Sequence, residues 1–290
     1  MITRAFLGTG LLGTGMAEGA LHRGDAVRVW NRTRERAEPI SQLGGSVHSS
    51  PVHAVEGAGI VHIVLTNDTA VDAVLALLEP SLADLASRQI PIVDHSTTSP
   101  AGTAARAEAL TARGLAYLHA PVFMSPSAAR AAQGTMIVAG PEEVFTRVQP
   151  LLAPMSAKLQ HVGARPDLAA AMKLFGNAMN LSMLHGLADI LSMAEGLGIP
   201  AERALDVFGV IDVRYVLDGR GRRMAEGNVE PLWTVDVAQK DVGLMMSCAP
   251  GVAMPALRAL SATLQAHQAA GEGELDVAVM GRRKPAVDTL

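Results

Sequence analysis

Short apolar runs typical of buried strands alternate with helical patterns through the first half of the chain. The runs occupy residues 4–8, 26–30, 60–65, 90–94 and 117–121, with helical patterns such as 69–78 and 102–113 between them. A further strand and helix are expected at 134–139 and 142–152. This alternation predicts an α/β domain in which helices cover both faces of a parallel sheet.

The second half of the chain has a different pattern. After about residue 163 strand-like runs almost vanish, and helix-length segments follow one another to the end of the sequence. A length of 290 residues also exceeds one typical domain. We therefore predict an α/β domain over 1–163 and an all-helical domain over 164–290.

Composition narrows the class of protein. Hydrophobic residues make up 49% of the chain, too many for intrinsic disorder, and the formal net charge of -4 argues against a nucleic-acid partner. The one cysteine, Cys248, cannot form an internal disulfide, and no spacing of His, Asp, Glu or Cys indicates a metal. These features favour the reducing cytoplasm.

The longest apolar stretch, residues 168–199, has the length of a membrane span. It contains Lys173, Asn177, Asn180, His185 and Asp189, whose side chains are costly in hydrocarbon. We therefore expect a buried helix of a soluble protein, with no membrane contact.

A glycine-rich turn follows the first predicted strand. Its residues are Gly8, Thr9, Gly10, Leu11, Leu12 and Gly13, in the spacing G-x-G-x-x-G. In a strand–turn–helix context the first glycine permits a tight turn, the second lets backbone approach a pyrophosphate, and the third lets helix and strand pack closely. The turn predicts a dinucleotide site in a doubly wound sheet of the Rossmann type.

The end of the second predicted strand favours NADP(H) over NAD(H). An acidic residue at this place would bind the 2′-hydroxyl of the NAD ribose. The chain has Asn31, Arg32 and Thr33 instead. Because a guanidinium pairs well with a phosphate, Arg32 is expected to bind the 2′-phosphate of NADP.

One lysine lies in an almost wholly apolar helical pattern. Lys173 shares a helix side with Asn177 and Asn180, while Ala169 and Ala170 precede it. An ammonium is expensive to bury. The pattern therefore indicates a lysine that faces a ligand, although a lysine whose head reaches solvent would also fit.

Together these motifs resemble the β-hydroxyacid dehydrogenase family, which includes 3-hydroxyisobutyrate dehydrogenases and tartronate semialdehyde reductases. The resemblance extends over almost the whole chain. Beyond the glycine turn and Asn31-Arg32-Thr33, it rests on Asp94-His95-Ser96-Thr97 with Pro100, Lys173 with Asn177, Lys240-Asp241, and Gly271-x-Gly273-x-x-Asp276. It implies a Rossmann domain joined through a long helix to an all-helical domain for substrate binding and dimerisation.

The resemblance also implies roles for individual residues. Lys173 and Asn177 would belong to the catalytic helix, Thr97 would lie beside the nicotinamide, and Lys240 would contact the cofactor from the helical domain. We further expect Leu65 and Thr66 to flank the adenosine half of the dinucleotide, and Ser96 to position the substrate.

The expected substrate loop departs from the family pattern. Where the family has Pro-Val-Ser-Gly-Gly, this chain has Pro121, Val122, Phe123, Met124 and Ser125. The two large side chains limit the close approach of backbone to a substrate carboxylate. Either the substrate is bulkier or less acidic than usual, or Phe123 and Met124 turn into the core while their N–H groups still bind.

We therefore expect an oxidoreductase that transfers a hydride between NADP(H) and a small 3-hydroxyacid or semialdehyde. Lys173 would act as general acid and base, with a pKa lowered by desolvation, and Asn177 would hold the same oxygen. Alternatives are reduction of imines or bulkier carbonyl compounds, or NADP binding without turnover. A mean hydropathy of +0.25 and an apolar helical half also suggest a homodimer or homotetramer.

Overall fold

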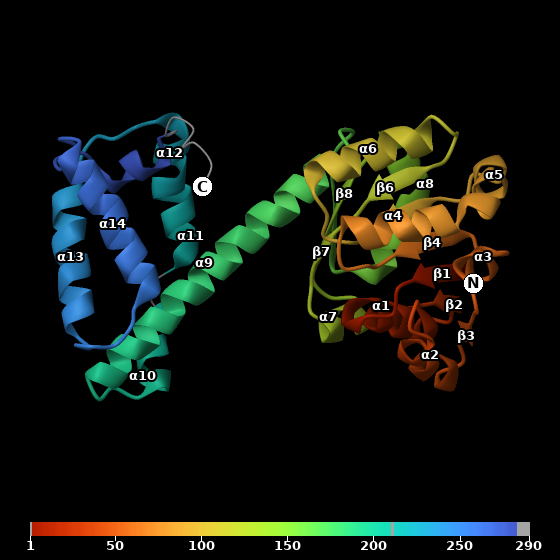
Figure 1. Cartoon of the computed structure of the whole chain (residues 1–290), viewed down its shortest axis with the longest axis horizontal. Helices are drawn as coiled ribbons and strands as arrows, with labels where there is room; N and C mark the ends of the chain where they lie inside the picture. The colour runs from red at the N-terminus through yellow and green to blue at the C-terminus, as the bar shows by residue number, and fades with distance from the viewer. Residues whose placement is uncertain (1, 210–211, 283–290) are drawn as a thin grey trace. The chain divides into compact units, whose positions relative to one another are not determined.

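The computed structural model of the chain divides into two compact units, residues 1–177 and 178–290 (Figure 1). It describes residues 2–209 and 212–282. Residues 210–211 and 283–290, which belong to the predicted helical domain, lie outside the described residues. The limit between the units falls within helix α9 (Leu168–Gly196), so a long helix joins them. Strand β9 (Lys158–Gly163) ends where the sequence predicts the architecture to change.

A mixed sheet forms the centre of the first unit, in the strand order β3-β2-β1-β4-β5-β6-β8-β7 with β9 beside β8. Its first six strands are parallel. They are β3 (Ser46–Val47), β2 (Ala26–Trp30), β1 (Thr3–Leu7), β4 (Ile60–Ile63), β5 (Ile92–Asp94) and β6 (Tyr117–His119). The predicted parallel sheet is therefore confirmed for this part of the chain.

The far edge of the sheet reverses direction. Strand β8 (Thr135–Ala139) is antiparallel to β6 and to β7 (Val122–Phe123), and it is parallel to β9. The link over residues 124–134 is too short for a parallel crossover, which takes a dozen or more residues. The predicted strand and helix at 134–152 do form, but the strand runs antiparallel to the six parallel strands of the sheet.

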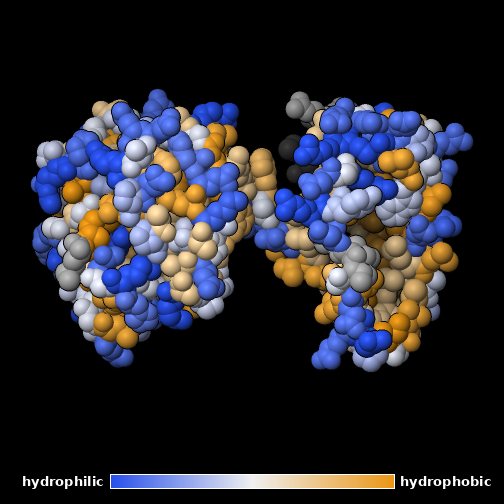
Figure 2. Space-filling view, turned by 180° about the vertical axis from the view of Figure 1, so that it is seen from behind, coloured by the Kyte–Doolittle hydropathy of each residue, from blue (hydrophilic) through white to orange (hydrophobic). Residues whose placement is uncertain are grey.

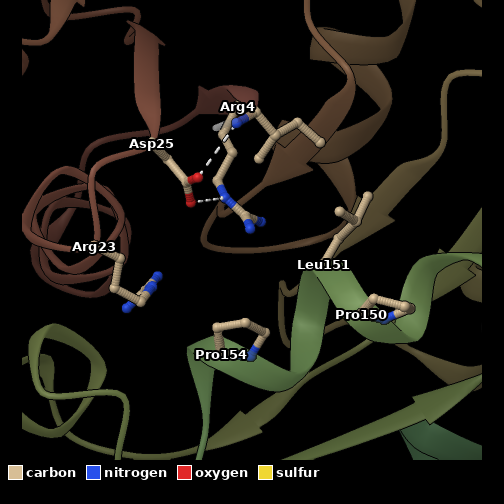
Figure 3. A pocket seen from close by; sticks show the side chains of 7 residues that line it. Arg4, Arg23, Asp25, Pro150, Leu151 and Pro154 are labelled. Atoms are coloured by element: carbon tan, nitrogen blue, oxygen red, sulfur yellow. Dashed lines mark hydrogen bonds and ion pairs between the residues drawn. The ribbon is translucent and has the colours of Figure 1, made fainter.

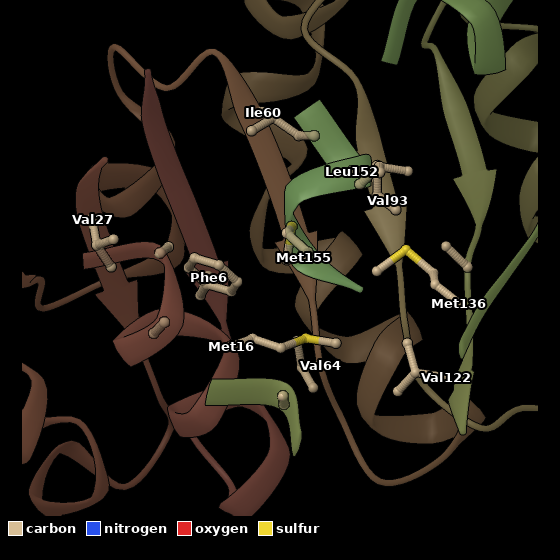
Figure 4. Packing of buried hydrophobic residues seen from close by; sticks show 14 of the residues in the cluster. Phe6, Met16, Val27, Ile60, Val64, Val93, Val122, Met136, Leu152 and Met155 are labelled. Atoms are coloured by element: carbon tan, nitrogen blue, oxygen red, sulfur yellow. The ribbon is translucent and has the colours of Figure 1, made fainter. Parts of the chain in front are cut away.

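Helices cover both faces of the sheet because its strands are apolar on both sides. One layer contains α1 (Leu11–His22), α2 (Glu38–Gln42), α7 (Pro126–Arg130) and α8 (Glu142–Leu152), which pack on Phe6 and Val93 (Figure 4). The other contains α3 (Pro51–Val55), α4 (Asp68–Leu77), α5 (Glu79–Ser87) and α6 (Pro100–Thr111), which pack on Leu7 and Ile92. Alternation along each strand thus builds two cores on one sheet.

The second unit is helical, as predicted. Besides the end of α9 it contains α10 (Ala201–Leu205), α11 (Val213–Val216), α12 (Arg222–Glu226), α13 (Val235–Ser247) and α14 (Pro255–Ala269). Its core includes Val235, Val242 and Leu264 of α13 and α14. The buried carboxylate of Asp189 accepts a hydrogen bond from Leu257 N (2.7 Å), which ties α9 to the first turn of α14.

Helix α9 differs from the buried helix expected from the sequence. Phe175, Leu181 and Leu184 are 71%, 66% and 61% exposed. Hydrophobic side chains also reach the surface elsewhere in the helical unit (Figure 2). Among the described residues, no helix combines the length and the apolar character needed to span a membrane.

Candidate active site

The glycine turn after β1 uses its three glycines in different ways. A Cβ on Gly8, whose φ is +108°, would collide with the carbonyl oxygen of Val64, and a Cβ on Gly13 would collide with the carbonyl oxygen of Gly8. Gly10 has no heavy atom within 4 Å of the place where its Cβ would stand. Two glycines are thus required by the fold itself, whereas Gly10 leaves space for a group outside the described chain.

The beginning of α1 has features of a phosphate cradle. Gly10 is the N-cap residue and provides no side-chain hydrogen bond to the first-turn N–H groups. Such groups, together with the helix dipole, attract anions. The hydroxyl of Thr9 is buried and has no partner among residues 2–209 and 212–282, while the Leu11 side chain is 83% exposed and that of Leu12 is half-buried. The residues present therefore fit a bound dinucleotide.

Asn31 connects this turn to the end of β2. Its Oδ1 accepts a hydrogen bond from Thr9 N (3.1 Å), and its Nδ2 donates to the carbonyl oxygen of Thr33 (2.8 Å). Asn31 thereby fixes the two loops that the sequence assigns to the cofactor. Arg32 and Thr33 are exposed, and the neighbouring Arg34 is paired with Glu38 at 2.8 Å.

The loops after β4 and β5 are joined in a similar way. Leu65 N donates to the Oγ of Ser96 (3.0 Å), and Ser96 N donates to the buried carboxylate of Asp94 (2.9 Å). Ser96 is itself only 2% exposed, so its hydroxyl is committed to this link. Thr66 and Thr97 are exposed at the carboxyl ends of adjacent parallel strands, where ligands bind in sheets of this kind.

Lys173 lies on the part of α9 that belongs to the first unit, and its ammonium lies over the ring of Phe123. The Nζ atom stands 4.2 Å from the centroid of the Phe123 ring, a cation–π distance. A Cβ on Gly176 would come within 2.5 Å of the Cζ of Phe123, so the ring lies directly against the helix at this glycine. Burial lowers the pKa of Lys173 from its usual value, because the charged form loses water.

The loop 121–125 contacts α9 through the side chain of Phe123. Pro121 and Val122 are buried in the sheet, and Met124 packs on the core beneath α1. The hydroxyl of Ser125 accepts a hydrogen bond from Ala128 N (3.1 Å) and so caps α7. Phe123 instead packs on Ala169 of α9 and reaches Lys173. Asn177 is half-buried one turn beyond Lys173, whereas Asn180 belongs to the second unit.

The candidates at the end of the sequence lie in the second unit. Lys240 is exposed and paired with the neighbouring Asp241 at 2.9 Å. The fully buried carboxylate of Asp276 accepts hydrogen bonds from the backbone N–H groups of Leu232 (3.0 Å), Trp233 (2.9 Å) and Ala278 (3.0 Å). A Cβ on Gly273 would come within 2.5 Å of the Asp236 carboxylate. In this unit the carboxylate of Asp276, the last residue of the motif, is therefore satisfied by backbone N–H groups of the protein.

Sequence reasoning missed two parts of the candidate site. The contact between Phe123 and Lys173 joins residues that are fifty positions apart, and no local pattern signals it. Gly176 offered a signal, since a glycine inside an otherwise good helix often marks a close approach.

Comparison with known proteins agrees with this architecture. The model of the NAD binding domain of 6-phosphogluconate dehydrogenase matches residues 3–163. The chain is 29% identical to the uncharacterized oxidoreductase YfjR of Bacillus subtilis, over 95% of this chain and 97% of the relative. It is 26% identical to 3-sulfolactaldehyde reductase of Escherichia coli, over 95% and 93%.

Among solved structures, an imine reductase from Myxococcus stipitatus in complex with NADP+ has the same fold. The TM-score is 0.84 at 19% identity, over 96% of this chain and 98% of that chain. The chain belongs to the 6-phosphogluconate dehydrogenase-like family of NAD-binding proteins, and within it to the β-hydroxyacid dehydrogenases. It is an NAD(P)-dependent oxidoreductase.

Proposed function

We propose that the protein transfers a hydride between NADP(H) and a small 3-hydroxyacid or semialdehyde, with Lys173 as general acid and base. The observation that carries this proposal is the position of Lys173. Lys173 lies on an apolar helix, and its ammonium lies over the ring of Phe123. Its pKa is lowered, and the glycine turn with its open position at Gly10 belongs to the same compact unit.

The nicotinamide, when bound, supplies or accepts the hydride at the substrate carbon. In the reducing direction negative charge develops on the carbonyl oxygen, and the ammonium of Lys173 donates a proton to it. In oxidation the neutral amine takes the proton from the alcohol. Because a lowered pKa brings the two forms of the lysine closer in energy near neutral pH, burial assists both directions. Asn177, one helical turn away, can donate a hydrogen bond to the same oxygen.

The preference for NADP over NAD rests on the end of β2. Arg32 is exposed there, next to an Asn31 that fixes the loop on the glycine turn. The loop 31–33 contains no carboxylate for a ribose 2′-hydroxyl, and a guanidinium pairs strongly with a 2′-phosphate. Thr9, Leu65, Thr66 and Thr97 complete the proposed cofactor surface, and the family resemblance also assigns Lys240 to the cofactor.

Two substrate classes fit the loop 121–125. The name of the Escherichia coli relative, 3-sulfolactaldehyde reductase, supports a small aldehyde that carries an acidic group. The Phe123 ring beside Lys173 favours a bulkier or less acidic carbonyl compound, or an imine, because an apolar ring cannot bind a carboxylate. Exposed residues Ser125 and Thr97 would contact the substrate at its polar end.

Self-association is also part of the proposal. In the second unit Tyr215, Leu232 and Leu244 are 75%, 72% and 60% exposed, in addition to the apolar residues of α9. Large exposed apolar areas favour burial by a second copy. We expect a homodimer or homotetramer in which the helical domain, 164–290, supplies the interface, and sedimentation as a monomer would contradict this. The single cysteine supports a cytoplasmic location.

A substrate panel tests the proposed reaction. Purified protein is mixed with NADPH or NADH and with small aldehydes that carry an acidic group, neutral aldehydes and ketones, and cyclic imines, and loss of reduced-cofactor absorbance is followed. Oxidation of NADPH by an acidic aldehyde is the expected result. Turnover of imines or neutral ketones alone would favour the second class. Binding of NADPH without turnover of any member would contradict an enzymatic role.

A further inference from the structure

A hollow of about 420 Å³ opens at the amino-terminal end of β1, whereas the glycine turn follows the carboxyl end of the same strand (Figure 3). The guanidinium groups of Arg4 and Arg23 and the carboxylate of Asp25 line it, and Pro150 and Pro154 form part of its wall. None of these residues takes part in the proposed reaction.

Arg4 is the buried member of this group. It is 2% exposed, and its Nε donates to the Oδ2 of Asp25 at 2.6 Å. Its Nη1 lies 3.4 Å from both the Sδ of Met155 and the Nε2 of His62. The Nη2 amino group has no hydrogen-bond partner among the residues that the structure describes, so the outer edge of the guanidinium is available to a ligand.

Arg23 adds a second positive charge beside the ion pair of Arg4 and Asp25. Its Nε is buried and makes no hydrogen bond within the described part of the chain. Burial lowers the pKa of Arg23 and the nearby charge of Arg4 lowers it further, and together they outweigh the Asp25 carboxylate, which raises it. Since Asp25 is the one carboxylate among the residues that line the hollow, two guanidinium groups face one negative charge.

We propose that this hollow binds a small oxyanion, such as phosphate or a short carboxylate, at the edges of Arg4 and Arg23. Guanidinium groups bind such anions through paired N–H donors. The anion would neutralise the excess positive charge and accept hydrogen bonds from donors that otherwise lack acceptors. A hollow of this size holds a phosphate together with several waters.

A buried chain of hydrogen bonds connects Arg4 to the centre of the sheet and offers a specific reporter. The Ala120 carbonyl oxygen can only accept, so the His95 Nδ1 at 2.7 Å donates to it. The His95 Nε2 then accepts from the His62 Nδ1 at 3.0 Å, which leaves the Nε2 of His62 as an acceptor for Arg4. Burial holds the pKa of His62 well below its usual value and that of His95 at about 4, so both rings are neutral near pH 7.

The test is a titration of the full chain with inorganic phosphate, and separately with acetate, followed by calorimetry and by the ring nitrogen signals of His62. We expect saturable binding that shifts the Nε2 signal of His62, because the anion changes the field at its Arg4 donor. Comparison of the phosphate titration with the acetate titration shows which of the two anions binds better.

Two variants locate the binding. Arg23→Gln should weaken phosphate binding at least tenfold, whereas Arg32→Gln, which removes the guanidinium proposed for the cofactor phosphate, should leave it unchanged. Binding that survives Arg23→Gln, that is lost in Arg32→Gln, or that leaves His62 unshifted would overturn the proposal, as would the absence of binding by either anion. None of these readouts depends on turnover, so the proposed reaction can fail without affecting the result.

Discussion

Both units contain residues that belong to sequence motifs, but these residues make different contacts in the two units. In the first unit Gly10 faces open space, the hydroxyl of Thr9 is buried without a described partner, and Lys173 lies over the aromatic ring of Phe123. In the second unit the Asp276 carboxylate accepts three backbone N–H groups, and Gly273 makes room for Asp236.

This contrast separates residues that the fold requires from residues that a ligand requires. A polar group satisfied by its own backbone stabilises the fold, because loss of its partners would leave buried donors unpaired. A buried or constrained group without a partner costs free energy and is more often retained for binding or chemistry. A sequence motif alone does not distinguish the two.

The largest effect is expected at Lys173. Replacing it with Met should lower kcat by about 10²- to 10⁴-fold, the usual contribution of a general acid. The affinity for NADPH and the Tm should change little, since the methionine fills the same space. Lys158→Met, which alters an exposed lysine of β9, is the matched control and should retain full turnover. Equal kcat values in the two variants would remove Lys173 from the reaction.

Asp276 should affect stability instead of chemistry. Asp276→Asn should lower the free energy of unfolding by about 2–3 kcal/mol, because a carboxylate that accepts three backbone N–H groups is replaced by a weaker acceptor. Chemical denaturation at pH 7 measures this. Asp206→Asn, at an exposed pair with Arg203, should cost less than about 1 kcal/mol.

The effect of Asp276 should depend on pH with a defined sign. Burial alone would raise its pKa, but the hydrogen bonds from Ala278, Trp233 and Leu232 outweigh burial and lower it. The unfolded chain therefore binds a proton at higher pH than the folded chain does. The stabilisation is complete above the unfolded pKa and disappears as pH falls through the folded pKa. A difference between Asp276→Asn and wild type that stays constant into acid would contradict this account.

Arg32 should decide between the two cofactors. Arg32→Gln is expected to raise the Kd of NADPH by about 10- to 100-fold, as for loss of one charge-assisted hydrogen bond, and to leave that of NADH nearly unchanged. Arg34→Gln, next to it but paired with Glu38, should have a smaller effect. Fluorescence titration with both cofactors measures the ratio, and equal weakening of both would show that Arg32 does not contact the 2′-phosphate.

The smallest expected effect concerns Phe123. A protonated Lys173 is required for reduction, so the rate of reduction should fall as pH rises through the lowered pKa of Lys173. Phe123→Leu admits water to the ammonium and should move this decline to higher pH. Met124→Leu, on the other side of the loop, should leave the pH profile unchanged. A decline that moves to lower pH in Phe123→Leu would mean that the cation–π contact outweighs burial.

The sequence predicted β2 and α8 to the residue and placed β1, β4, β5 and β6 within two residues. It missed the two-residue strands β3 and β7, because so short a run has no detectable period, and it also missed the six-residue strand β9. The Gly271-x-Gly273-x-x-Asp276 segment was singled out only through a family resemblance, and its structural use became evident from the partners of Asp276.

Local physical chemistry was enough for the order of elements, the glycine turn and the lysine in its apolar helix, because side-chain periodicity and backbone freedom act over a few residues. Long-range packing set the reversal of β8, the ring of Phe123 under Lys173, and the meeting of Arg4 with Arg23. Each of these depends on strand register and on which helix covers which face of the sheet. Contacts of that kind form between segments far apart in the chain, so the pattern of residues within a short segment does not predict them.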